Sequence, residues 1–161
     1  MLPAWENFFS TEVGASAALA GLIFVGLSIN ITRILSYPRL PGRAIQSLAL
    51  LSAILVVALL ALVPSQPVYS FGTEVAVVGL AVWVILFRFD LVNYGATNSE
   101  YRHSYLVIVA LNQCCGVLYV LGGLVTVAFG NVGVDLLVPA TVLSFLKALI
   151  DAWVLLVEIN R

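Results

Sequence analysis

Apolar residues fill five long stretches of the chain, and short clusters of proline, glycine and charged residues separate them. Each stretch reaches or approaches the roughly 17–25 residues with which a helix crosses the hydrocarbon layer of a membrane. Because lipid offers no partner to backbone N–H and C=O groups, only helices suit such segments. The pattern therefore predicts an all-α integral membrane bundle of five transmembrane helices, at about residues 11–31, 44–63, 73–87, 105–129 and 136–157.

The composition agrees with a protein that lies almost entirely in the membrane. Of the 161 residues, 62% are hydrophobic and 9% are charged, whereas ordinary soluble domains carry about 25% charged residues. The polar connections are too short to form a soluble domain of their own. We therefore expect residues 1–161 to form a single transmembrane domain, with the lipid bilayer as its first partner.

The basic residues indicate how the chain is oriented. With five crossings, all but one of the seven lie on the same side of the membrane: Arg33, Arg39, Arg43, Arg88, Arg102 and Arg161. Since basic connections stay in the cytoplasm, this predicts an outer N-terminus and a cytoplasmic C-terminus. The chain is then a multi-pass protein of the bacterial inner (plasma) membrane. An alternative has four crossings and a fifth helix lying on the outer surface.

Several classes of function are excluded by the same residues. The net charge is −1 and no dense basic cluster occurs, so nucleic acid is not an expected partner. Cys114 and Cys115 are adjacent, which suits neither a disulfide nor a zinc site, and the single histidine, His103, lies in a polar connection. We predict no metal, no cofactor and no catalytic residue, and hence no enzyme.

The fifth segment contains the most unusual residues of the chain. Lys147 lies near its midpoint, and Asp151 follows one helical turn later, on the same face as Ser144. Each ionisable residue at the centre of a transmembrane helix costs about 2.5–3.5 kcal/mol on the insertion scale, so this face is expected to need partners inside the bundle. Two interpretations remain open: a salt bridge that fixes packing, or a relay for protons or ions.

The fourth segment carries a second line of polar residues. Tyr105, Asn112, Tyr119 and Thr126 recur every seven residues, which is typical of a close helix–helix contact. We expect Asn112 and Tyr119 to hydrogen-bond across to the face of Lys147. The predicted intramembrane polar core is thus Lys147, Asp151, Asn112, Ser144 and Tyr119.

Acidic residues begin the first and third segments on the predicted outer side. Glu12 and Glu74 have no basic residue nearby, so in a symmetric oligomer they are predicted to form an acidic mouth that attracts cations. The alternative is that each acid offsets the positive end of a helix dipole. Small residues on the first segment, among them Gly14, Ala18 and Gly21, form the kind of face through which membrane helices associate.

The beginning of the chain resembles small, uncharacterised bacterial polytopic membrane proteins. The resemblance covers about residues 5–63 and consists of Trp5, Phe8, Phe9, residues 14–18 and residues 21–30. It implies a membrane protein of the same class, brings no agreed activity with it, and assigns a role to no residue.

Together these patterns predict a small homo-oligomeric inner-membrane protein that acts as a channel or transporter for a small cation or proton. The alternative is a non-catalytic accessory or assembly subunit, in which the polar face of the fifth segment docks another membrane protein.

Overall fold

A computed structural model describes residues 5–37, 40–95 and 102–157, with side chains from residue 105 in the last range. These residues form helices and short connections, and no strand occurs among them. Five stretches are long and apolar enough to cross a membrane, the fifth comprising α6 and α7 together. The predicted all-α bundle of five membrane-length helices is therefore confirmed. Its elements are α1 (Glu6–Ile29), α2 (Ile31–Ser36), α3 (Leu40–Ala61), α4 (Val68–Gly95), α5 (Arg102–Phe129), α6 (Val132–Asp135) and α7 (Leu137–Leu156).

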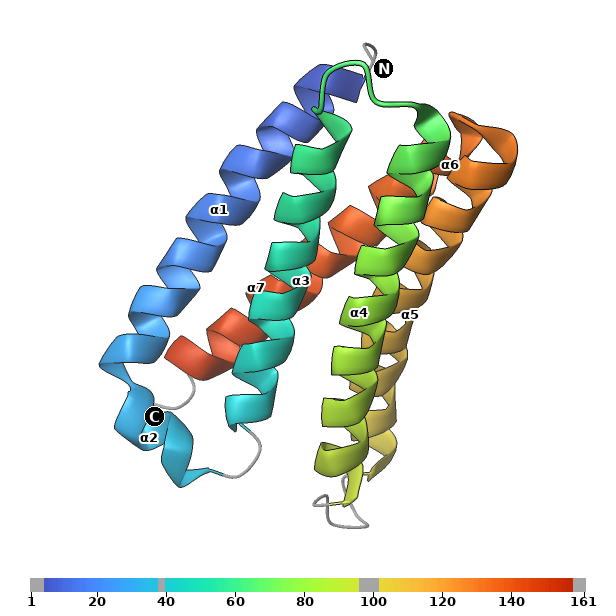
Figure 1. Cartoon of the computed structure of the whole chain (residues 1–161). Helices are drawn as coiled ribbons and strands as arrows, with labels where there is room; N and C mark the ends of the chain where they lie inside the picture. The colour runs from blue at the N-terminus through green and yellow to red at the C-terminus, as the bar shows by residue number, and fades with distance from the viewer. Residues whose placement is uncertain (1–4, 38–39, 96–101, 158–161) are drawn as a thin grey trace.

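Helix α3 lies at the centre of the bundle and packs against α1, α4 and α7. Helix α7 runs obliquely behind α3 and also contacts α5 and α1, while the start of α1 and the end of α7 lie at opposite ends of the molecule (Figure 1). The polar face of α7 is buried by these neighbours. A helix lying on a membrane surface would instead turn its polar face to water, so the packing favours five crossings over four.

Helices α4 and α5 approach so closely that their backbones touch. A Cβ atom at Gly123 would lie 2.4 Å from the backbone nitrogen of Ala76, and one at Gly79 would lie 2.8 Å from Cβ of Tyr119. Such distances exclude any side chain at either glycine without movement of a helix. Small residues are the usual means by which membrane helices reach this separation, and here they hold α4 and α5 together as a hairpin.

The third predicted segment, residues 73–87, is too short, because α4 begins at Val68 and continues past Arg88 to Gly95. Arg88 is exposed, whereas Asp90 and Asn93 are buried, so the polar residues after Phe87 belong to two faces of one helix. Residues that resembled a loop in sequence thus extend the helix by about two turns.

The first and last segments are each divided. The backbone N–H and the side-chain amide of Asn30 both donate to the carbonyl of Gly26 at 3.2 Å, which ends α1 before the short helix α2 begins. At the other end of the chain, Leu136 separates the short helix α6 from α7. Before α6, Gly130 has a φ of +66° in the turn after α5, a conformation that favours glycine. Helix α1 also begins earlier than residue 11, and α3 earlier than residue 44.

The basic residues that the structure describes outside the membrane-spanning centre lie at one end of the bundle. Arg33 lies in α2, Arg43 in the first turn of α3, and Arg88 in the last third of α4. Helix α2, the start of α3 and the end of α4 all lie at the lower end of the bundle in Figure 1. We call this the basic end. Arg39, Arg161 and the side chain of Arg102 lie outside the described residues.

Candidate functional site

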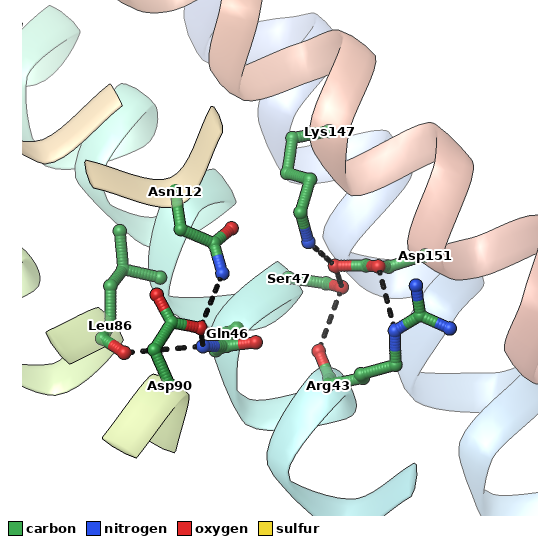
Figure 2. Close-up of polar contacts among 8 residues, drawn as sticks. All are labelled: Arg43, Gln46, Ser47, Leu86, Asp90, Asn112, Lys147 and Asp151. Atoms are coloured by element: carbon green, nitrogen blue, oxygen red, sulfur yellow. Dashed lines mark hydrogen bonds and ion pairs between the residues drawn. The ribbon is translucent and has the colours of Figure 1, made fainter. Parts of the chain in front are cut away.

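The carboxylate of Asp151 is fully buried and is held by two hydrogen-bond donors and one further ion pair, from two helices. Nζ of Lys147 donates to Oδ2, Oγ of Ser47 donates to the same oxygen at 3.2 Å, and Nε of Arg43 forms an ion pair with Oδ1 at 3.3 Å (Figure 2). The Lys147 side chain is only 3% exposed, whereas that of Arg43 is 20% exposed. We call these four residues the Asp151 site. It combines one negative and two positive charges.

A second buried carboxylate, that of Asp90 on α4, is held by side-chain amides. Nε2 of Gln46 and Nδ2 of Asn112 each donate to Oδ1 at 2.8 Å, and Nε2 of Gln113 donates to Oδ2 at 2.9 Å. Gln46 Nε2 also donates to the carbonyl of Leu86 at 3.2 Å (Figure 2). We call these five residues the Asp90 site. Its donors come from α3 and α5, so it ties three helices together.

Helix α3 separates the two carboxylates and contacts both of them. Gln46 and Ser47 are consecutive, and adjacent residues of a helix point about 100° apart. Gln46 therefore reaches Asp90 on one side while Ser47 reaches Asp151 on the other, as Figure 2 shows. Both sites lie toward the basic end, because Gln46 and Ser47 follow Arg43 by about one turn.

From the Asp151 site, polar side chains continue through the bundle toward the opposite end. Cys115 on α5 is buried beside Ser144 and within electrostatic range of Lys147. Tyr119, one turn further along α5, is buried beside Ser144 and Thr141. These contacts extend the polar surroundings of Lys147 along the facing sides of α5 and α7.

The far end of this line is Glu12 on α1. Its carboxyl group lies beside Thr141 and within electrostatic range of Tyr119, although the sequence suggested a place at an outer mouth. We call the whole line the polar row, and every residue in it is classed as buried. Its members are Glu12, Thr141, Tyr119, Ser144, Cys115, Lys147 and Asp151.

The hydroxyl groups of the polar row have oxygen atoms that can accept further hydrogen bonds. Oγ1 of Thr141 donates to the carbonyl of Leu137, and Oγ of Ser144 donates to that of Ala140, both at 2.7 Å. Each hydroxyl oxygen retains lone pairs that can accept hydrogen bonds from neighbours. Among the described residues, the buried Oε1 of Glu12 and Oη of Tyr119 have no hydrogen-bond partner.

The structure places the predicted site residues in two groups. Lys147, Asp151, Ser144 and Tyr119 lie together in the polar row. The sequence led us to expect a hydrogen bond from Asn112 to the face of Lys147. In the structure the amide of Asn112 donates to Asp90 on α4 instead, because α5 presents position 112 to that helix. Glu74 is half-buried, accepts a hydrogen bond from Gln66, and has different neighbours from Glu12.

Sequence reasoning missed several residues of these sites, among them Ser47, which donates to Asp151. Asp90 and Gln46 are nearly fully buried, and Arg43, assigned to a connection, pairs with Asp151. A signal for Asp90 was present, because it continues the spacing of three and four residues that marks the buried face of α4 at Val82 and Leu86.

Comparison of the chain with protein families, with curated proteins and with solved structures gave no match. The function is therefore argued from the geometry of these residues alone.

Proposed function

We propose that the protein transfers protons across the membrane along the polar row, between Glu12 and Asp151. The observation that carries this proposal is a series of neighbouring carboxyl, hydroxyl, thiol and ammonium groups buried inside an apolar bundle. Ionisable groups within a membrane are costly and mark proton or ion pathways. Groups that both accept and donate protons allow transfer in short successive steps.

Burial favours a proton over the small cation that the sequence also allowed. No residue of the polar row is more than 5% exposed. Glu12 has this highest value, and several others, such as Ser144 and Asp151, are fully buried. A hydrated cation needs a lumen whose wall residues are accessible to water. A proton needs no open lumen, only donor and acceptor groups near one another, and the polar row consists of such groups.

The two ends of the polar row differ in charge, and this suggests its orientation. Asp151 lies toward the basic end, beside Arg43, while Glu12 lies on α1 toward the other end. By the positive-inside rule the basic end is cytoplasmic. We propose a multi-pass protein of the bacterial inner membrane, with Glu12 on the outer side and the C-terminus in the cytoplasm.

The proposal is tested with purified protein in liposomes that enclose a pH-sensitive dye. A potassium gradient and valinomycin set a negative interior potential, and proton entry then acidifies the lumen. We expect rapid acidification with the unaltered chain and loss of most of it with Glu12→Gln or Tyr119→Phe. Glutamine cannot take up a proton at the entrance, and phenylalanine keeps the ring while removing the hydroxyl.

The matched control is Glu6→Gln, which makes the same chemical change at an exposed carboxyl group in the first turn of α1. It should acidify liposomes at the rate of the unaltered protein. Correctly folded protein that acidifies them no faster than protein-free liposomes would overturn the proposal. So would Glu12→Gln and Tyr119→Phe variants that both retain the full rate.

The alternative function, an accessory subunit, depends on what the polar face of α7 contacts. In the accessory-subunit hypothesis Lys147 and Asp151 would face another membrane protein. Within one copy of the chain both are already paired and at most 3% exposed, so docking would have to use a different surface. This observation favours proton transfer as the function of these residues.

A further inference from the structure

The Asp90 site differs from the Asp151 site in its charge balance. Asp90 is 3% exposed, and its partners, Gln46, Asn112 and Gln113, are all neutral amides. No basic side chain of the described residues forms an ion pair with it, whereas Asp151 has two. A buried carboxylate without an opposing charge is costly in a membrane, and the hydrogen bonds from the three amide donors offset this cost at Asp90.

The groups around Asp90 also form a set of potential oxygen ligands. A half-turn of a terminal amide exchanges its NH₂ for its carbonyl oxygen, so each of the three amides can present either atom. Oxygen atoms from carboxylate, amide and backbone carbonyl groups are the ligands that hard cations prefer. The carbonyl of Leu86, which already lies within hydrogen-bonding distance of Gln46, adds a backbone oxygen to this set.

One of these oxygens has no competing contact. Oδ1 of Asn112 is completely buried and has no hydrogen-bond partner among the described residues. Buried side-chain oxygens are nearly always satisfied in folded proteins. In the structure the amide nitrogen of Asn112 faces Asp90 and Oδ1 faces away (Figure 2). A half-turn of this amide would bring Oδ1 to the carboxylate; it would break the hydrogen bond from Nδ2 to Asp90 and none made by Oδ1.

We propose that the Asp90 site binds a monovalent alkali-metal cation between the carboxylate and the side-chain amides. A single positive charge neutralises the carboxylate, whereas a divalent ion would leave a net positive charge buried among neutral groups. Gln113 is only half-buried and forms the edge of the site at which an ion can enter or leave. This proposal does not depend on proton transfer, because the Asp90 site and the polar row share no residue.

The test measures cation binding by purified protein in detergent, independently of transport. Thermal unfolding is followed while NaCl or KCl replaces choline chloride at constant ionic strength. At a hundred times the dissociation constant, the preferred ion should raise Tm by about 5–10 °C. Equilibrium dialysis with ²²Na⁺ or ⁸⁶Rb⁺ should show saturable binding that the same ion displaces.

Asp90→Asn keeps the shape of the side chain and removes its charge, so it should abolish the rise in Tm and the isotope binding. Gln113→Met, at the half-buried edge, removes one potential ligand and should weaken binding on the order of tenfold. The control, Glu6→Gln, should bind as the unaltered protein does. No effect of either cation relative to choline would overturn the proposal. So would an effect that persists in Asp90→Asn, or a Tm that depends on pH alone.

Discussion

Within the Asp151 site, removing the charge of Asp151 should lower the free energy of unfolding more than removing the charge of Lys147. Asp151→Asn leaves the ammonium group of Lys147, 3% exposed, without its carboxylate, while Arg43 at 20% exposure can still reach water. Breaking a buried ion pair in this way costs about 3–5 kcal/mol. Lys147→Met leaves Asp151 paired with Arg43 and bonded to Ser47, so it should cost about 1.5–3 kcal/mol, the usual worth of a hydrogen bond to a charged group.

The double variant Lys147→Met/Asp151→Asn separates pairing from simple loss of contacts. It leaves no buried charge unpaired at these two positions, so its stability should exceed that of Asp151→Asn alone. The free energy of unfolding is measured for all four proteins in mixed micelles of increasing SDS content, with helicity followed by circular dichroism. Equal costs for the two single variants, or strictly additive costs in the double variant, would refute this account of the site.

Three further predictions concern packing, association and orientation. Gly123→Ala should destabilise the protein by about 1–3 kcal/mol or more, because its Cβ would meet the backbone of Ala76. Gly14→Ala, with open space around it, should be neutral or stabilising by up to about 1 kcal/mol. Thermal unfolding of the two variants measures this difference. A Cβ atom at Gly21 would meet nothing within 4 Å in one copy, so Gly21→Ala should leave Tm unchanged. A loss of cross-linked oligomers in this variant would locate a self-association face on α1, and unchanged cross-linking would argue against it. A reporter fused after Arg161 should be active in the cytoplasm, and periplasmic activity would contradict the proposed orientation.

The sequence was sufficient to find Lys147 and Asp151 because their interaction is local. Two residues four apart on one helix share a face wherever that helix packs. Their partners on α3 could not be found in the same way, since Ser47 lies 104 positions away from Asp151 in the chain. The pattern of residues within one segment does not reveal which neighbouring helix packs against the face of α7 that carries Lys147 and Asp151.

Asp90 was missed for a different reason: the end of the third predicted segment was placed from hydropathy alone. Arg88 lowers the local hydropathy, and the polar residues after it resemble a connection. In the structure Arg88 faces outward, while Asp90 and Asn93 continue the buried face of the same helix. The spacing of buried positions therefore predicts the true end of α4 better than mean hydropathy does, whereas the number of membrane-length helices follows from hydropathy correctly.

The position of Gln46 and Ser47 on consecutive residues of α3 has a mechanical consequence. Both side chains are attached to one rigid turn, so any rotation of α3 about its axis displaces both together. A rotation that withdraws Gln46 from Asp90 must also move Ser47 relative to Asp151. A rotation of α3 would therefore change the surroundings of both carboxylates at once, although no hydrogen bond joins the two acids.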